Sequence, residues 1–319
     1  FNFDKDVILN SAPGFAAKGQ DLFVAAGDKL KTLRRTGATT PFQTAQQLAI
    51  ALDSGRGPAA FWDYDGDGDP DMFRTANDGG ALLLTPNEGT VYSAAWGTPV
   101  RIEDVPISLG NAANGYSQDQ YVFGDADADS AMDFFVQGQD GRIARYAALP
   151  PASAGAPPTF TLVDGDFGEV ATEVVEDVVP CGIALVDLDS MKKDATPHAL
   201  ELLTVYRHAG GASIKMVDVL FGVTADATGL LPGTDGGLLD LATVQSLAGG
   251  DLDMDGQPDL VVSQALGGGE TALHWFRNVY GGDLFYFSFE YAGTLEVPNA
   301  TDSLDARYVT LADVDKDRD

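Results

Sequence analysis

Short apolar runs, bounded by glycine- or aspartate-rich segments, recur along the 319-residue chain. The run "PAAFW" (58–62) precedes one acidic segment and "MFRTA" (72–76) follows it, while "DFFVQ" (133–137) and "DLVVS" (259–263) stand in the same place in later copies. The runs are rich in aromatic and β-branched residues and are bounded by turn residues, so they predict β-strands rather than helices.

A glycine-rich turn and a third apolar run follow each of these strands. The turns are "NDGG" (77–80), "QDGR" (139–142), "HAGG" (208–211) and "LGGG" (266–269). Asp-Gly between two apolar runs predicts a β-hairpin, because both residues tolerate positive φ. A fourth run, such as "TPVRI" (98–102), comes before the next acidic segment, so each period reads as four antiparallel strands.

The acidic segments themselves repeat. They are "DYDGDGDPD" from Asp63, "DADADSAMD" from Asp125, "DLDMDGQPD" from Asp251 and "DVDKDRD" from Asp313, with a weaker version, "DLDSMKKD", from Asp187. The intervals are 125 − 63 = 62, 187 − 125 = 62, 251 − 187 = 64 and 313 − 251 = 62 residues. So regular a period indicates a tandem repeat, which decides the architecture.

Four-stranded antiparallel sheets repeated around an axis form a β-propeller, and stacked blades bury faces that a single blade exposes. An open β-solenoid is the alternative, but its repeats are shorter. We therefore expect an all-β chain with one propeller domain over residues 1–319, in which 1–12 form an N-terminal strand or linker. The sequence ends inside a repeat, which predicts five blades plus the start of a sixth, in a ring of six or seven. In another closure, residues 306–312 complete the first blade beside Asp21.

Each acidic segment presents carboxylates at alternate positions, which suits Ca²⁺, and glycine at position six permits the sharp turn. An EF-hand is disfavoured, because the bidentate Glu of position twelve and the flanking helices are missing. The predicted ligands are Asp63, Asp65, Asp67, Asp69 (through its carbonyl) and Asp71; Asp125, Asp127, Asp129 and Asp133; Asp251, Asp253, Asp255 and Asp259; and Asp313, Asp315 and Asp317. Asp187, Asp189 and Asp194 are weaker candidates, because Lys192 and Lys193 oppose a dication. Three or more calcium sites are expected.

The D-x-D-x-D-G-x-x-D loops at Asp63 and Asp251, the hairpin behind each, "ALHWFRN" (272–278) and "VFGD" (122–125) resemble the FG-GAP/VCBS repeat family. That family includes the head propeller of integrin α subunits and many bacterial surface and secreted proteins. The resemblance runs from about Gly14 to Asp319. It implies a calcium-binding β-propeller and no particular activity, since the family hosts adhesins, sugar-binding proteins and some enzymes.

Composition narrows the partners. The net charge of −29 argues against nucleic acid or an anionic membrane as a partner, and no apolar run reaches the length of a membrane span. One cysteine, Cys181, rules out an intrachain disulfide and is expected to be buried. Extracellular calcium modules bind calcium with dissociation constants of about 10⁻⁴–10⁻³ M, and cytosolic calcium does not saturate such sites. An extracellular, secreted or cell-surface location is therefore expected.

We therefore expect a non-catalytic, calcium-stabilised propeller for adhesion, recognition or scaffolding, with a protein or carbohydrate ligand on the loops of a propeller face. The alternative is a propeller enzyme acting on carbohydrate, of the polysaccharide lyase or sugar dehydratase type. A cluster of His, Tyr, Arg and Lys side chains on one face would favour the enzyme. Ligands confined to the Asp loops would favour the binding module.

Overall fold

The computed structural model is described for residues 21–26, 29–35, 42–47, 56–89, 94–103, 105, 120–127, 129, 131–138, 141–153, 155–169, 179–186, 188, 200–208, 211–219, 222–233, 236–253, 255, 257–267, 270–279, 288–295 and 308–312. Within these residues, helical structure is confined to two short 3-10 turns, η3 (Phe167–Glu169) and η4 (Leu241–Thr243). The all-β prediction is confirmed. None of the helical segments described is long and apolar enough to cross a membrane.

The strands form five antiparallel sheets of four strands each, which we number as blades I to V. Blade I contains β20 (Tyr308–Ala312), β1 (Asp21–Ala26), β2 (Lys29–Arg35) and β3 (Phe42–Gln47); blade II contains β4 (Arg56–Trp62), β5 (Asp71–Thr75), β6 (Leu82–Thr85) and β7 (Val100–Ile102). Blade III contains β8 (Gln120–Gly124), β9 (Met132–Gln137), β10 (Ile143–Leu149) and β11 (Thr159–Asp164); blade IV contains β12 (Val179–Val186), β13 (Glu201–His208), β14 (Gly211–Asp218) and β15 (Val223–Asp226). Blade V contains β16 (Val244–Gly250), β17 (Asp259–Gly267), β18 (Glu270–Asn278) and β19 (Phe289–Leu295).

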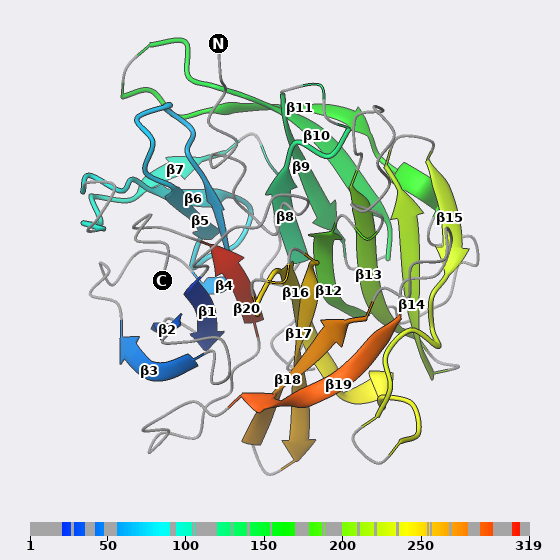
Figure 1. Ribbon diagram of the computed structural model, residues 1–319. Helices are drawn as coiled ribbons and strands as arrows, with labels where there is room; N and C mark the ends of the chain where they lie inside the picture. The colour runs from blue at the N-terminus through cyan, green and yellow to red at the C-terminus, as the bar shows by residue number, and fades with distance from the viewer. Residues whose placement is uncertain are drawn as a thin grey trace.

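The blades stand around a common axis. Figure 1 shows the first strand of each blade near the centre and the fourth strand, such as β3, β11 or β19, at the periphery. The inner strands β20, β4, β8, β12 and β16 contact one another in a closed cycle. The propeller prediction is therefore confirmed, but the ring has five blades in place of the six or seven expected from the repeat count.

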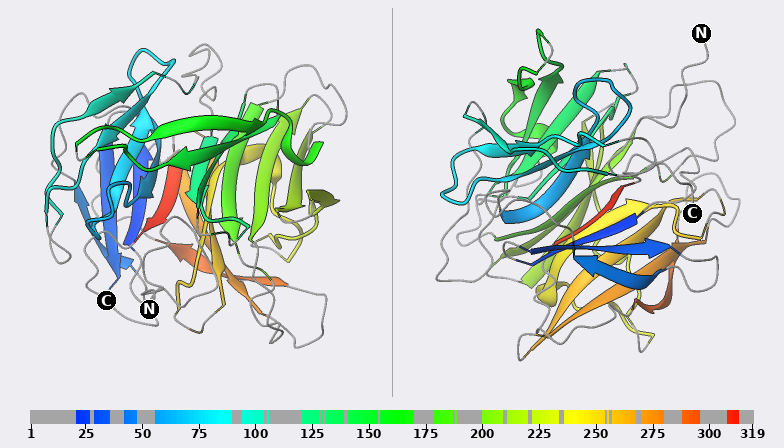
Figure 2. Two further views of the ribbon diagram at one scale, coloured as in Figure 1. Left: turned by 90° about the horizontal axis from the view of Figure 1, so that it is seen from above. Right: turned by 90° about the vertical axis from the view of Figure 1, so that its left-hand side faces the viewer.

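Ring closure explains the difference in blade number. The C-terminal strand β20 pairs antiparallel with β1, with Asp21 opposite Ala312 and Ala25 opposite Tyr308. Figure 2 shows β20, in red, beside the blue strand β1. The last inner strand thus completes the first blade instead of opening a sixth, which is the alternative closure considered above.

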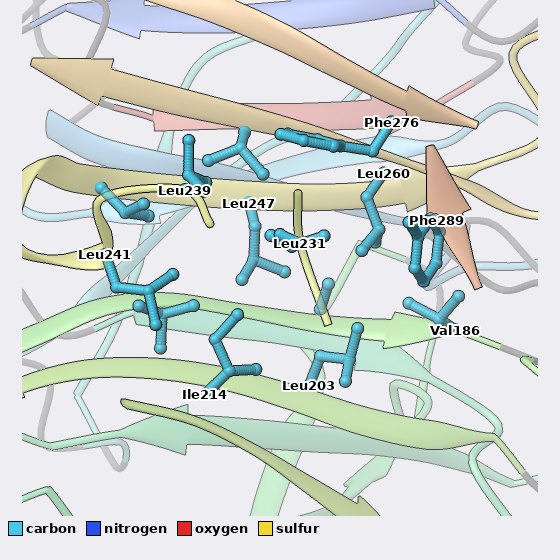
Figure 3. Close-up of a cluster of buried hydrophobic side chains, with 14 of the residues drawn as sticks. Val186, Leu203, Ile214, Leu231, Leu239, Leu241, Leu247, Leu260, Phe276 and Phe289 are labelled. Atoms are coloured by element: carbon cyan, nitrogen blue, oxygen red, sulfur yellow. The ribbon is translucent and has the colours of Figure 1, made fainter. Parts of the chain in front are cut away.

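The hydrophobic core lies between neighbouring blades. In Figure 3, Leu203 and Ile214 of blade IV face Leu247, Leu260 and Phe276 of blade V. The interface between blades II and III is aromatic, because the buried rings of Trp62, Phe73, Phe123 and Phe134 pack in one cluster there. Each blade buries its sides against two neighbours, so the stability of the ring depends on every interface.

A small pocket between the inner strands of all five blades is lined mostly by apolar side chains. Hydrogen bonds across it join neighbouring blades. The Tyr121 hydroxyl donates to the Pro58 carbonyl over 2.8 Å, and the Thr310 hydroxyl donates to the Ala59 carbonyl over 2.5 Å. These bonds tie blade III to blade II and blade II to the closing strand β20.

The predicted glycine hairpins are present where the structure describes them. Between β5 and β6, Gly79 and Gly80 have φ values of 74° and 75°, and Gly141 has a φ of 80° before β10. Residues other than glycine are strained in this left-handed region. The turn sequence therefore fixes each hairpin locally.

Candidate metal centres

The predicted ligands of three Asp loops fall within the described residues, and all three loops join the innermost strand of a blade to its second strand. They connect β4 to β5, β8 to β9, and β16 to β17. The ninth-position acids Asp71, Asp133 and Asp259 are buried. Each lies opposite the last residue of the inner strand, so the three loops share one backbone register.

In the blade II loop, Asp63 holds the turn from inside. Its Oδ1 accepts a hydrogen bond from the Gly66 amide over 2.9 Å, and its Oδ2 accepts one from the Gly68 amide over 3.0 Å. The two glycines have φ values of 76° and 98°, which accounts for glycine at the sixth position. Carboxylate oxygens of Asp63, Asp65 and Asp71 lie within 4.8 Å of one another.

The other two predicted ligands of this loop have different surroundings. Oδ1 of Asp67 accepts a hydrogen bond from the backbone amide of Asp69 over 2.9 Å, and the side chain of Asp69 is buried. The close group of oxygens thus combines the first, third and ninth positions of the loop. The use of the Asp69 carbonyl as a ligand stays a prediction.

The blade V loop brings together the first, third and fifth positions, and the ninth-position Asp259 is not part of the close group. Oxygens of Asp251, Asp253 and Asp255 lie within 4.8 Å of one another, and the Asp255 amide donates to Asp251 Oδ1 over 3.1 Å. Arg277 approaches from the side, with its Nε 2.7 Å from Asp253 Oδ2. The buried Asp259 accepts a hydrogen bond from Trp275 Nε1 over 3.1 Å, which explains why this tryptophan points into the blade.

The ninth-position acids also anchor the third strand of the blade. Asp71 Oδ1 accepts a hydrogen bond from the backbone N–H of Asn87 over 2.8 Å, and Asp259 Oδ1 accepts one from the backbone N–H of Asn278 over 2.9 Å. Each asparagine stands one residue beyond the position opposite the acid, so the two bonds are equivalent. The acid therefore connects the loop to the rest of its sheet.

The blade III loop differs, because an arginine enters it. Oxygens of Asp125, Asp127 and Asp129 lie within 4.8 Å of one another. Arg145 donates to Asp133 through Nε (2.9 Å) and Nη2 (3.0 Å), and to Asp127 Oδ2 through Nη2 (2.6 Å). The sequence did not reveal this contact, since it depends on the register between β9 and β10.

Burial dominates the electrostatics of the ninth position. Desolvation raises the pKa of Asp71 to about 8, that of Asp259 to about 7 and that of Asp133 to about 6. Hydrogen bonds and the charge of Arg145 lower the pKa of Asp133 and offset part of this rise. Burial also raises the pKa values of Asp63 and Asp255, helped by neighbouring carboxylates. An ionised carboxylate at these positions needs a positive partner.

The donor sets suit a hard divalent cation. Each of the three loops offers carboxylate oxygens that are close enough to share one ion. Ca²⁺ and Mg²⁺ prefer oxygen ligands, whereas structural zinc sites use Cys and His, which none of these three groups contains. Three loops could thus hold a metal ion, and oxygen-ligated cations fit them best.

Blade IV carries an acid that the sequence reasoning missed. Glu201 lies opposite Val186, the last residue of its inner strand, so it occupies the register of the ninth position. Its Oε2 accepts from the Leu188 amide over 2.7 Å, as Asp71 accepts from Tyr64. Its place directly before the apolar run "LLTVY" (202–206) was the available signal. The candidates Asp187, Asp189 and Asp194 lie outside the described residues.

In blade I the register gives the ninth position to Asp21, which lies opposite Ala312 at the end of β20. The strand before Asp21 in the sheet therefore comes from the other end of the chain. The predicted ligands Asp313, Asp315 and Asp317 follow β20 in the sequence and lie outside the described residues.

Cys181 is buried in β12, as predicted, but it has a basic neighbour that the sequence did not suggest. The Arg207 Nε lies 2.9 Å from its sulfur. Burial nevertheless raises the thiol pKa and outweighs the effect of the arginine. A buried thiol with a raised pKa is a poor nucleophile, so Cys181 belongs to the packing of blade IV.

The fold and its loops define the chain as a five-bladed β-propeller with acidic loops at the ends of its inner strands. No protein-family model matches the chain, and no curated protein matches it. Among solved structures, it is similar to a nidogen/laminin complex, at 13% identity over 80% of this chain and 73% of that chain with a TM-score of 0.39. It is also similar to AofleA from Arthrobotrys oligospora, at 9% identity over 83% of this chain and 64% of that chain with a TM-score of 0.37.

Proposed function

We propose that this protein is a calcium-stabilised propeller that works outside the cell as a non-catalytic recognition or scaffolding module. The observation that carries the proposal is the repeated cage: in blades II, III and V, loop carboxylates converge at the same register and a buried ninth-position acid closes the loop. Convergent acids repel one another without a cation. Calcium would relieve that repulsion and join loop to sheet in each blade.

The choice of calcium supports the proposed location. Sites of this kind in extracellular modules bind calcium with dissociation constants of about 10⁻⁴–10⁻³ M, and only extracellular calcium reaches that range. The resemblance of the loops to the FG-GAP/VCBS family agrees with this location, and so does the strongly acidic composition, which keeps a secreted protein soluble.

The partner surface that the structure supports best is the outer edge of blade III. The loop between β10 and β11 (150–158) is largely exposed, and Leu149, Leu162 and Val163 on the strands beside it expose apolar side chains. Exposed apolar side chains next to a polar loop are typical of protein or carbohydrate contact sites. The loop after β15 is less suitable, because its Leu231 and Leu239 are buried in the core between blades IV and V.

Calcium removal tests the proposal. We expect calcium in hundredfold excess over its dissociation constant to stabilise the metal-free protein by about 2.7 kcal/mol per occupied site. The effect should fade towards pH 4, because protons compete with calcium for the carboxylates. Scanning calorimetry with and without chelator measures both effects. A melting temperature at pH 7 that ignores the chelator would contradict the proposal.

A single ligand can be removed as a matched test. Asp65→Asn should reduce the calcium-induced rise in melting temperature. Because Asp65 is exposed, the metal-free variant should be as stable as the metal-free wild type. Asp78→Asn is the control, since Asp78 is an exposed acid paired with Arg101 outside the cages. Equal calcium responses in the two variants would show that the blade II loop is not a calcium site.

A further inference from the structure

The guanidinium of Arg145 lies inside the acidic loop of blade III. Two of its nitrogens bind both oxygens of Asp133, and Nη2 also binds Asp127 (2.6 Å). Arg145 therefore bridges the third and ninth positions of the loop. In blade II, the close group of carboxylate oxygens where the proposed cation would lie contains these same two positions, Asp65 and Asp71.

The surroundings of Arg145 hold it in place. Its side chain is only 17% exposed, and its guanidinium lies 5.9 Å from the ring centroid of Phe135 and 5.7 Å from that of Phe167. Arginine favours such sites, because its planar head stacks on aromatic rings while binding a carboxylate bidentately. A partly buried, bidentate pair is far less screened by solvent than a surface ion pair.

The equivalent positions in the other blades carry no charge. Arg145 lies opposite Phe135, two residues after the ninth-position acid. In blade II that register belongs to Leu84, opposite Phe73, and in blade V to Trp275, opposite Val261. Trp275 also donates to its ninth-position acid, through a neutral indole N–H.

Blade V does contain an arginine near its loop, but the geometry is different. Arg277 has an Nε 2.7 Å from Asp253, and its side chain is 41% exposed. In the sheet it occupies the position directly opposite Asp259, so its side chain and that of Trp275 follow the same face of β18 two residues apart. Arg277 is more exposed than Arg145 and binds only the third-position acid, so a cation can displace it more easily.

We propose that Arg145 is a built-in counter-ion that lowers the calcium affinity of the blade III loop below that of the loops in blades II and V. This inference rests on the proposed calcium function. A dication bound by Asp125, Asp127 and Asp129 would share the Asp127 carboxylate with Nη2 and would be repelled by the positive charge that Arg145 holds between Asp127 and Asp133. The expected penalty is on the order of tenfold or more in affinity, because ligand charge sets the affinity of such oxygen sites.

The test is calorimetric titration of the chelator-treated protein with CaCl₂. The wild type should show two tighter sites and a third that is weaker by roughly tenfold or more. Arg145→Met removes the charge and keeps the chain length, so its third site should tighten towards the other two. Arg277→Met is the matched control, and it should leave the blade III site weak. Three equal sites in the wild type, unchanged in Arg145→Met, would overturn the proposal.

Thermal melting in chelator adds a readout that does not depend on binding. Arg145→Met should melt at a lower temperature than the wild type and recover more on calcium addition, because Asp127 and Asp133 lose their counter-ion. If Arg145→Met does not fold, Arg145→Lys keeps a charge but loses the bidentate bond, and the same changes should appear in smaller measure. An unchanged melting temperature in both variants would count against the counter-ion role.

Failure of this inference can be told from failure of the calcium proposal. If Asp65→Asn loses a site that the wild type has, calcium binding stands, and the Arg145 variants then decide the counter-ion question alone. If neither the wild type nor any variant binds calcium, the calcium proposal falls and this inference falls with it.

Discussion

Gly182 on the inner strand β12 provides the sharpest test of how the ring is packed. A Cβ placed on Gly182 would lie 2.9 Å from the backbone nitrogen of Leu247 and 3.2 Å from the carbonyl carbon of Ser246, both on the inner strand β16 of blade V. Because these are backbone atoms, no rotamer change can relieve the contact. Gly182→Ala therefore requires blades IV and V to separate locally.

The expected cost follows from two opposing effects. Overpacking of this kind typically destabilises by about 1–3 kcal/mol. Gly182 does not have a positive φ, so alanine also reduces the entropy of the unfolded chain and returns about 0.4–1 kcal/mol. The net loss in the free energy of unfolding should then lie between about 0 and 2.6 kcal/mol, with about 1.3 kcal/mol at the centre of the range.

Urea unfolding in excess calcium, followed by tryptophan fluorescence, measures this loss. Gly229→Ala is the matched control, because a Cβ at Gly229 has no neighbour within 4 Å and its φ is not positive. The control should be neutral or slightly stabilising. If Gly182→Ala were as stable as Gly229→Ala, the close approach of β12 to β16 would not be a constraint on the ring.

Two further predictions concern ring closure and pH. Leu311→Ala should lower the free energy of unfolding in urea by about 2–5 kcal/mol, because Leu311 of β20 is fully buried in a cluster with Leu22 and Val261. Leu266 is exposed, so the control Leu266→Ala should change the free energy of unfolding by less than about 0.5 kcal/mol. Equal losses would mean that β20 does not stabilise the ring. Burial lowers the pKa of His274. Below about pH 6.5 the unfolded chain therefore takes up a proton that the folded chain refuses, and stability falls as the pH drops. His274→Gln should reduce the fall between pH 7 and pH 5 in thermal melts, and an unchanged fall would exclude this histidine as its source.

Local features of the fold could be predicted from sequence, and non-local ones could not. The hairpin at Gly79 and Gly80 follows from turn chemistry within a few residues, and the repeat period places each inner strand before its acidic loop. The blade count depends on whether β20 pairs with β1, almost 300 residues away in sequence, and no local pattern carries that choice.

The candidate sites divide in the same way. Ligand positions within one loop follow from spacing, and Asp63, Asp65 and Asp71 do converge. The position of Arg145 in the loop depends on how β10 pairs with β9. In blade IV the connection before β13 is longer, so counting nine residues from Asp187 does not find the ninth-position acid, and Glu201 occupies that register. Spacing therefore predicts which acids of a loop converge, but strand register decides which other charges lie beside them.

The ninth-position acid has a role that precedes metal binding. In four blades it accepts a hydrogen bond from the amide of the second loop residue, over 3.2 Å at Tyr64, 3.4 Å at Ala126, 2.7 Å at Leu188 and 3.2 Å at Leu252. The bond persists in blade III, where an arginine satisfies the acid, and in blade IV, where the acid is a glutamate. A buried amide without this acceptor would cost about 1–3 kcal/mol. Because the acid makes this bond both with and without an arginine beside it, the fold alone explains why the acid is repeated, and each candidate cation site lies beside an acid that the blade already requires.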